Sequence, residues 1–173
     1  MDTRLRDKVC LITGASGGIG REIARTFHEE GALLVLQGNT QFAGLEEFVA
    51  EIGATDRVLC LQYDVSDRQA CFDAARQGAE RFGRLDILIN NAGIWKGAPV
   101  EEISDGEWSE MIGVNLTGTF NVINHIDLVT RVPLLTQGYR HIGRRMYFNE
   151  SGAFTPDAST WVVARDDLTY RLR

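Results

Sequence analysis

No apolar stretch of the 173-residue sequence approaches the roughly 20 residues that a membrane-spanning helix needs. Near the N-terminus, the apolar run Val9–Ile12 is broken by the glycine-rich residues 14–20 before the apolar region of a signal peptide forms. The three cysteines have no metal-ligand spacing, and their odd number argues against a disulfide framework. We therefore expect a cytoplasmic protein with plain thiols, no membrane partner and no metal.

Positive charge is also scarce, and it is unevenly spread. The chain has 18 basic and 24 acidic residues, a formal net charge of −6, which does not favour nucleic-acid binding. Residues 1–125 hold most of the acids, whereas residues 126–173 hold seven arginines, no lysine and five acids. The basic excess of the tail is small, so we interpret it as a solvated surface and predict no nucleic-acid partner.

Short apolar runs alternate with helical patterns over the first two-thirds of the chain. The runs predict strands at Val9–Ile12, Leu33–Leu36, Val58–Leu61 and Leu85–Ile89, with helices between them. Continuous apolar strands separated by helices are typical of a parallel sheet that is covered on both faces. The sequence therefore predicts an α/β fold with a doubly wound, Rossmann-like parallel sheet.

Two helix starts carry the pattern of a capping box, Ser66 with Gln69 and Ser104 with Glu107. The second of these opens a long helix that we expect to reach about residue 130, before Pro133. Beyond Pro133 the periodicity fades, and the apolar patches 146–148 and 161–164 predict one more strand and part of a helix.

Residues 13–20, Thr-Gly-Ala-Ser-Gly-Gly-Ile-Gly, join the first predicted strand to the first helix. A helix N-terminus offers unpaired N–H groups and the positive end of a dipole, and glycine allows a pyrophosphate to approach the backbone. The spacing of Gly14, Gly18 and Gly20 differs from the commoner Gly-x-Gly-x-x-Gly pattern. We predict a phosphate-binding turn; the alternative is a tight turn without a ligand.

The end of the second predicted strand bears on the choice of cofactor. Sites for NAD usually place an acid there to bind the ribose 2′-hydroxyl, but Gln37 and Asn39 are neutral. No arginine or lysine stands there to bind a 2′-phosphate, and the direction of Arg21 cannot be read from the sequence. The sequence leaves the choice between NAD and NADP open, with a slight preference for NADP.

Four stretches in this order resemble the short-chain dehydrogenase/reductase family, and in particular its 3-oxoacyl-carrier-protein-reductase-like members. They are residues 13–20, Asp64-Val65, Asn90-Asn91-Ala92-Gly93 and Asn115-Leu116-Thr117-Gly118. The resemblance covers about residues 6–125. It implies a dinucleotide-binding Rossmann-like domain over residues 1–130 and a divergent tail over residues 131–173. It also implies a sheet that is incomplete on its C-terminal side.

The resemblance implies a role for each matching residue. The pyrophosphate side of NAD(P) would be held by Gly14, Ser16, Gly18, Ile19 and Gly20. The adenine would be flanked by Asp64 and Val65, and the central groove would be lined by Asn90, Ala92 and Gly93. In the family, the Asn that Asn115 matches helps to hold a water in a proton relay. As alternatives, Asp64 would only cap a helix, and Asn115 would bond only to backbone.

The resemblance does not extend to the catalytic residues of the family. Members use a Tyr as general acid, a Lys four residues later that lowers its pKa, and a Ser that orients the carbonyl. This chain has no Tyr-x-x-x-Lys, and both of its lysines, Lys8 and Lys96, precede the expected position. In one alignment Trp161 and Arg165 replace the Tyr and the Lys, and Ser151 lies near the Ser. Otherwise the tail is unrelated sequence.

Three functions follow from these observations. The first is an NAD(P)-dependent oxidoreductase that transfers a hydride between nicotinamide and a small carbonyl or alcohol substrate. The second is a catalytically silent NAD(P)-binding or interaction module, as a homo-oligomer or paired with a full-length relative. The third is a truncated product with no stable fold, in which a frameshifted or spliced tail replaces the family sequence. The substrate cannot be named, although Trp95 and Lys96 are expected to face the pocket.

Overall fold

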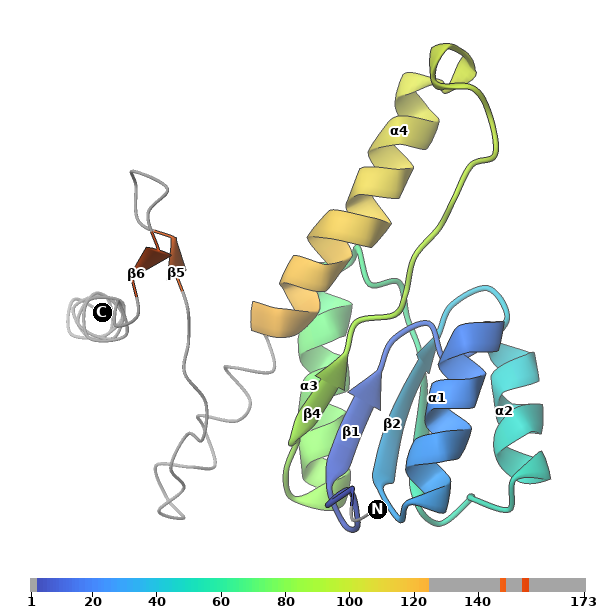
Figure 1. Ribbon diagram of the computed structural model, residues 1–173, viewed down its shortest axis with the longest axis vertical. Coiled ribbons are helices and arrows are strands. Elements are labelled where there is room, and N and C mark those ends of the chain that lie inside the picture. Colours follow the sequence, from blue (N-terminus) through green and yellow to red (C-terminus); the bar gives the residue numbers. More distant parts are fainter. Residues whose placement is uncertain (1–2, 125–146, 149–153, 156–173) are drawn as a thin grey trace. The chain divides into compact units, whose positions relative to one another are not determined.

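The computed structural model describes residues 3–124, 147–148 and 154–155 (Figure 1). In the first of these stretches, strands and helices alternate in the predicted order. The elements of this stretch are β1 (Val9–Ile12), α1 (Gly18–Glu29), β2 (Leu33–Gly38), α2 (Phe42–Glu51), β3 (Val58–Gln62), α3 (Arg68–Phe82), β4 (Ile87–Ile89), a 3₁₀ turn (Val100–Glu102), α4 (Asp105–Ile112) and a π-helical segment (Gly113–Gly118).

The four strands of the first stretch form one parallel sheet in the order β3-β2-β1-β4. At its centre, Ile12 of β1 pairs with Leu36 of β2 on one side and with Ile89 of β4 on the other. The ribbon shows α1 and α2 on one face of this sheet and α3 on the other (Figure 1). The prediction of a doubly wound parallel sheet is confirmed.

Alternate side chains of β1 and β2 enter two separate apolar clusters. Cys10, Ile12, Leu34 and Leu36 pack with α1 and α2, whose fully buried contributors include Ala24 and Leu45. The intervening side chains pack with α3; this second cluster includes Val9, Leu11, Val35, Cys71 and Ala75. Because both faces of the central strands are buried, their sequences are continuously apolar instead of alternating.

Three strand boundaries differ from the prediction, among them the end of β3, which lies at Gln62 and not at Leu61. Strand β2 continues past Leu36 through Gly38, because Gln37 and Gly38 still pair with Leu61 and Gln62 of β3. Strand β4 begins at Ile87, although the apolar run begins at Leu85. Just before the strand, Asp86 bonds to Val9 twice: its carboxylate accepts from the N–H of Val9 at 2.9 Å, and its own N–H donates to the Val9 carbonyl at 2.8 Å.

The chain divides into two units, residues 1–137 and 138–173. In the second unit, β5 (Tyr147–Phe148) pairs antiparallel with β6 (Phe154–Thr155). The predicted boundary after residue 130 and the expected reach of the long helix beyond residue 124 lie outside the described residues. The described part of that helix runs through α4, the π-helical segment and residues 119–124.

The capping box predicted for Ser66 and Gln69 is wrong. The residue that caps α3 is Asp67, whose Oδ1 accepts hydrogen bonds from the backbone N–H groups of Gln69 at 2.8 Å and Ala70 at 3.0 Å. The Ser66 hydroxyl instead donates to Asp64 at 2.7 Å. An aspartate next to the serine competes for the cap, and its charge is also favoured by the helix dipole.

We therefore expect Asp67→Ala to destabilise the protein by about 1 kcal/mol, because two N–H groups of the first turn lose their acceptor. The matched variant Ser66→Ala should cost less, about 0.5 kcal/mol, since it leaves those N–H groups bonded. Urea unfolding followed by circular dichroism measures both values. A larger loss for Ser66→Ala than for Asp67→Ala would restore the original prediction.

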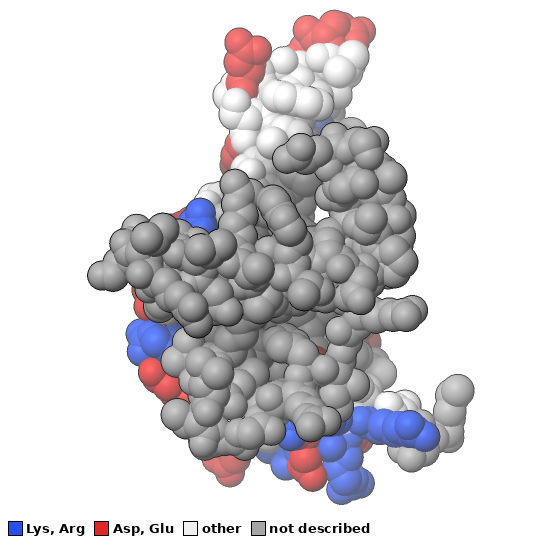
Figure 2. Space-filling view, turned by 90° about the vertical axis from the view of Figure 1, so that its left-hand side faces the viewer, with Lys and Arg blue, Asp and Glu red and all other residues white. Residues whose placement is uncertain are grey.

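The second predicted capping box is confirmed at the start of α4. Ser104 accepts from the N–H of Glu107, and the Glu107 carboxylate accepts from the N–H of Ser104 at 3.0 Å. These bonds to Ser104 lower the pKa of Glu107. Acidic side chains gather around this helix start, from the 3₁₀ turn and the first turn of α4 (Figure 2). They complement the positive end of the helix dipole.

All three cysteines are free thiols, as predicted. Burial, reinforced by nearby carboxylates, raises the pKa from 9.0 to about 12 for Cys10 and Cys71 and to about 11 for Cys60. In the unfolded chain these thiols ionise near pH 9. Their contribution to stability is therefore complete below pH 9 and is lost as the pH rises towards 11–12.

We expect the free energy of unfolding to fall by about 2–3 kcal/mol between pH 8 and pH 10 through Cys10 and Cys71, which are both buried. Urea unfolding at the two pH values measures this change. Substituting both residues by Ala should remove most of the pH dependence, even if it lowers the stability at pH 8. An unchanged slope in the double variant would contradict the assignment to these thiols.

Candidate nucleotide-binding site

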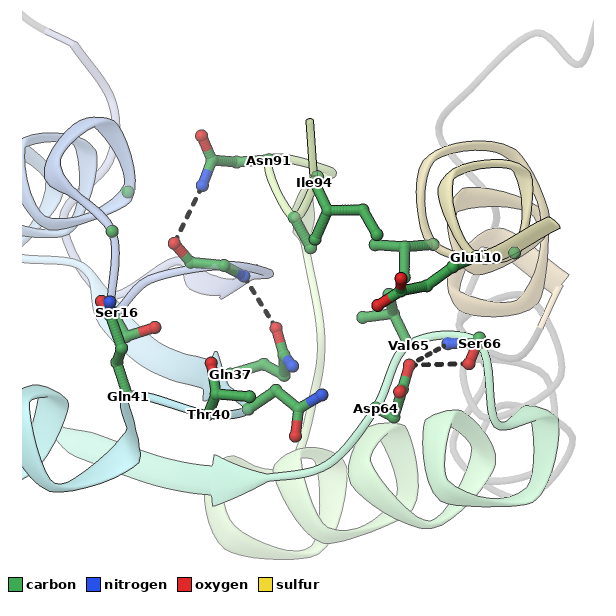
Figure 3. A pocket seen from close by; sticks show the side chains of 18 of the residues that line it. Ser16, Gln37, Thr40, Gln41, Asp64, Val65, Ser66, Asn91, Ile94 and Glu110 are labelled. Atoms are coloured by element: carbon green, nitrogen blue, oxygen red, sulfur yellow. Dashed lines mark hydrogen bonds between the residues drawn. The ribbon is translucent and has the colours of Figure 1, made fainter. Parts of the chain in front are cut away.

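A cavity of about 580 Å³ lies where the carboxyl ends of the strands meet (Figure 3). Its wall comes from the glycine turn after β1, the loop after β2, the residues after β3 and β4, and one side of α4 with the π-helical segment. Crevices at this edge are the usual ligand sites of open parallel sheets, and the volume suits a small-molecule ligand.

Most of the residues predicted to bind a cofactor line this one cavity. They are Gly14, Ser16, Gly18, Ile19, Gly20, Asp64, Val65, Ala92 and Gly93. Asn90 departs from the prediction: it is exposed and does not line the cavity, whereas its neighbour Asn91 does. Asn115 lies beside the wall, next to Val114, and Ser151 lies outside the described residues.

The glycines of the turn serve two different purposes. Gly14 has φ +65°, and a Cβ atom there would lie 2.7 Å from the Cα of Ala92, so the tight turn itself requires glycine. A Cβ atom at Gly20 would collide with the Gly14 carbonyl oxygen. At Gly18, in contrast, a Cβ atom would meet no protein atom within 4 Å. Packing among the described residues therefore does not require glycine at position 18, where the chain borders the cavity.

The start of α1 has features that are favourable for an anion. The helix has 12 residues, its N-cap Gly17 makes no side-chain cap bond, and its first turn has no acidic residue. The first N–H groups of a helix have no partner within the helix, and they carry its positive dipole end. Gly17, Gly18 and Ile19 all line the cavity at this point, so a phosphate group can approach the backbone closely.

Two polar side chains that the sequence analysis did not single out hold the glycine turn against the segment after β4. The hydroxyl of Thr13, which is 1% exposed, accepts hydrogen bonds from the N–H groups of Asn91 at 3.1 Å and Ala92 at 3.0 Å. In return, the Asn91 amide donates to the carbonyls of Thr13 and Gly14, both at 3.0 Å. The motifs 13–20 and 90–93 are thus one bonded unit.

Gln37 supports the turn from the side of β2. Its Oε1 accepts from the N–H of Gly14 at 2.7 Å, and its Nε2 donates to the carbonyl of Tyr63 at 2.5 Å. The side chain is 3% exposed, so it is a structural brace at the end of the strand. The open edge of the cavity beyond β2 is formed instead by Asn39, Thr40 and Gln41, which are all uncharged.

Asp64 shapes the turn between β3 and α3. Its Oδ1 accepts from the backbone N–H of Ser66 at 2.8 Å and from the Ser66 hydroxyl (Figure 3). The alternative that Asp64 caps the helix is wrong, since Asp67 is the cap. Behind this turn, the buried amide of Asn121 donates to the carbonyls of Val65 at 3.2 Å and Ser66 at 3.1 Å, which fixes the wall of the cavity.

The side chain of Asn115 bonds to backbone on both of its polar atoms. Its Oδ1 accepts from the N–H of Ile94 at 2.8 Å, and its Nδ2 donates to the carbonyl of Ile94 at 3.0 Å. Its own carbonyl accepts from the Thr119 hydroxyl at 3.1 Å. In the described structure Asn115 thus holds the segment after β4 in place.

The two lysines are both engaged in ion pairs. Lys96 pairs with Glu110 at 3.0 Å, and neither Trp95 nor Lys96 lines the cavity, contrary to the expectation. Lys8 precedes β1, at the strand's opposite end from the glycine turn, and pairs with Asp86 at 3.9 Å. Trp161 and Arg165, the proposed replacements of the Tyr and the Lys, lie outside the described residues.

In the part of the chain that the structure describes, no cluster of three or more His, Cys, Asp or Glu side chains suits a metal ion. Within the same residues, no helix is long and apolar enough to cross a membrane.

A family profile described as short chain dehydrogenase matches residues 8–128. The chain belongs to the short-chain dehydrogenase/reductase family. The matched stretch contains the whole parallel sheet and every described residue that lines the cavity. The family resemblance inferred from the four motifs is thereby confirmed.

Individual relatives agree with this assignment. The 3-oxoacyl-(acyl-carrier-protein) reductase of Thermotoga maritima is 38% identical over 120 residues, which are 69% of this chain and 48% of that protein. The NADP-dependent (R)-specific alcohol dehydrogenase of Lentilactobacillus kefiri is also 38% identical over 120 residues, 69% of this chain and 47% of that protein. The chain thus spans about half the length of the curated relatives it matches.

A solved structure shows the same fold with a cofactor bound. The 3-ketoacyl-(acyl-carrier-protein) reductase from Brucella melitensis complexed with NADH superposes with a TM-score of 0.68 at 32% identity. The likeness covers 78% of this chain and 54% of that one. The family and the fold of this chain are therefore those of oxidoreductases that bind nicotinamide dinucleotides.

Proposed function

We propose that this chain binds NAD(P) in the cavity at the carboxyl ends of its strands, as the cofactor-binding part of a short-chain dehydrogenase/reductase. The observation that carries the proposal is Gly18. The described protein atoms do not require a glycine there, but a pyrophosphate at the start of α1 would. The named relatives and the bound NADH of the Brucella melitensis protein support the same ligand class.

The residues around the cavity suggest how the cofactor would be held. The backbone of residues 17–20 would bind the pyrophosphate, and Asp64 and Val65 would flank the adenine. Ala92, whose N–H is held by Thr13, and Gly93 would lie along the central groove. Asn115 would hold Ile94, the next residue, in place. Residues 39–41 form an uncharged edge, without an acidic side chain that would repel a 2′-phosphate. This supports a slight preference for NADP.

For the reaction, we propose hydride transfer between the nicotinamide and a small carbonyl or alcohol substrate. The bound cofactor would supply or accept the hydride. The chain would supply the binding and the orientation, but its general acid is not identified, because the sequence has no Tyr-x-x-x-Lys. Ser151 remains a proposal for orienting the substrate.

The positions of the two lysines favour a second function, a catalytically silent NAD(P)-binding module. Both are held in ion pairs, and neither lines the cavity. Such a module would act by association with a second copy or with a full-length relative. Exposed apolar side chains along the helix support association: Trp108, Ile112, Leu116, Phe120 and Ile123.

A fluorescence titration of the 173-residue protein with NADPH and with NADH tests the proposed function. Saturable binding of either nucleotide is the expected result, and the emission of the bound nucleotide reports it directly. Turnover over a panel of ketones, aldehydes and alcohols then separates the oxidoreductase from the silent module. If neither nucleotide binds to a cooperatively folded protein, the proposed function is wrong.

A further inference from the structure

The side chain of Gln37 joins two parts of the cavity wall that lie far apart in the sequence, the glycine turn and the turn after β3 (residues 63–66). Its Oε1 accepts a hydrogen bond from the N–H of Gly14 at 2.7 Å (Figure 3). Its Nε2 donates to the carbonyl of Tyr63 at 2.5 Å, directly before Asp64. Gln37 itself also lines the cavity. Within residues 3–124, no other side chain is hydrogen-bonded to both turns.

An amide is unexpected at this position of the strand. β2 is apolar from Leu33 through Leu36, and the alternation of side chains places Gln37 on the same face as Val35, which packs in the cluster against α3. Gln37 is buried, and burying an amide costs free energy unless its polar atoms are bonded. A polar side chain that interrupts a core pattern is expected where a functional site requires it.

The end of β2 is the common anchor of the two turns. Through the backbone, the carbonyl of Gln37 accepts from the N–H of Ala15 at 2.8 Å, and the carbonyl of Gly38 accepts from the N–H of Tyr63 at 3.2 Å. The Gln37 side chain adds a second bond to each turn. Two bonds fix the orientation of a segment as well as its position, whereas one bond allows it to rotate.

We propose that Gln37 is a positioning residue that sets the spacing between the pyrophosphate turn and Asp64, so that one dinucleotide can contact both. The inference rests on the proposed function, since it assumes that a dinucleotide lies in the cavity. A ligand that contacts two subsites binds more tightly than either of its parts only if the subsites lie at the spacing of its own groups. Because the protein fixes that spacing beforehand, little conformational entropy is lost on binding.

Three ligands that compete with bound NAD(P)H measure the contribution of Gln37. ADP-ribose contains both adenosine and pyrophosphate and would contact both turns, whereas adenosine and inorganic pyrophosphate would each contact one. Gln37→Met keeps nearly the length of the side chain and removes both polar atoms. It should raise the dissociation constant of ADP-ribose at least about ten-fold and leave those of adenosine and pyrophosphate within about two-fold of the parent protein.

Gln62 offers a matched control at the end of the neighbouring strand β3. Its Nε2 also donates to a backbone carbonyl, that of Asn39 at 3.1 Å, but its side chain does not line the cavity and has no described bond to the glycine turn. Gln62→Met therefore makes the same substitution without touching the link between the two turns. It should leave all three dissociation constants within about two-fold.

Gln37→Met leaves the N–H of Gly14 and the carbonyl of Tyr63 unpaired, so its unfolding is measured first. If it does not unfold cooperatively, Gln37→Glu decides. The ionised glutamate accepts from Gly14 but cannot donate to Tyr63, whereas the protonated form does both. Burial and the Tyr63 carbonyl should raise the pKa of this glutamate above its usual range. Its ADP-ribose constant should therefore match the parent's at about pH 5.5 and exceed it at least about five-fold at about pH 8.5.

The parent protein and Gln62→Glu are measured at the same two pH values. They account for Asp64 and Glu110, the acidic side chains that line the cavity among residues 3–124. Equal losses for all three ligands in Gln37→Met, or no loss for ADP-ribose, would overturn the inference and leave the proposed function standing. So would an ADP-ribose constant of Gln37→Glu that follows the parent's at both pH values. Absence of NADH and NADPH binding by the parent protein would overturn both.

Discussion

Gly18→Asp is expected to abolish NAD(P)H binding while leaving the fold intact. The new side chain meets no protein atom near its Cβ, so the turn can keep its shape. Its carboxylate would stand at the start of α1, where we place the pyrophosphate. Two like charges about 4 Å apart repel by about 4 kcal/mol at an effective dielectric constant of 20. The dissociation constant should therefore rise by more than about 100-fold.

Gly106→Asp is the matched control for this variant. Gly106 lies in the first turn of α4, is exposed, and does not line the cavity. The same acid is thus introduced at a helix start, where it should not lower stability, and nucleotide binding should be unchanged. Titration with NADPH and NADH, together with thermal unfolding, measures both effects.

Two results would contradict the role of Gly18. If Gly18→Asp bound nucleotide as tightly as the parent protein, the pyrophosphate would not lie at this turn. If the variant unfolded more than about 5 °C below the parent protein, the glycine would have a structural role that the open space around it does not explain. Gly20→Asp, where the backbone is crowded, should by comparison lose stability and binding together.

The fold could be predicted from the sequence because its central strands are buried on both faces. Val9–Ile12 is apolar at every position, and the structure places all four side chains in the core. The sequence was less informative where backbone groups bond to side chains. The carboxylate of Asp86 bonds to the N–H of Val9 just before β4, and Asp67 replaces Ser66 as the cap of α3. Such bonding depends on local geometry that the spacing of residues does not record.

The sequence predicts those parts of the candidate site in which a motif identifies a backbone position. Gly14 and Gly20 could be found because only glycine fits the crowded backbone of such a turn, and Gly18 because the same motif brings the backbone close to a ligand. The braces could not be found, because Thr13 and Gln37 bond to residues that lie far away in the sequence. Arg21 illustrates the same difficulty: its position was evident from the sequence, but its direction follows from contacts with Ser16 and with the distant Gly44.

Cofactor binding and catalysis depend on residues in different parts of this chain. The cavity is built by residues 14–114, all of which lie within the stretch matched by the family. The expected proton donor and the lysine beside it would come later in the sequence, where Trp161 and Arg165 stand in one alignment. An indole N–H can donate a hydrogen bond but does not exchange a proton near neutral pH. Binding without turnover is therefore consistent with every residue of the described site.

The largest loss of stability is expected from Thr13→Val. The two side chains have nearly the same shape, but valine has no oxygen to accept the N–H groups of Asn91 and Ala92. Thr13 is 1% exposed, so water cannot readily replace the lost acceptor. An N–H group that is left unpaired costs about 1–3 kcal/mol when it is buried; Asn91 and Ala92 are half-buried, so the total loss should be about 2–3 kcal/mol.

Thr13→Ser separates the hydrogen bonds from the packing. Serine keeps the oxygen and removes only a methyl group, so it should cost about 1 kcal/mol. Urea unfolding measures the free energy of both variants, and NADPH titration shows whether the glycine turn keeps its shape. A loss for Thr13→Val no greater than that for Thr13→Ser would mean that the threonine hydroxyl does not hold the two motifs together. A large loss confined to Thr13→Val, with weaker nucleotide binding, would show that one buried hydroxyl couples the stability of the sheet edge to the shape of the phosphate site.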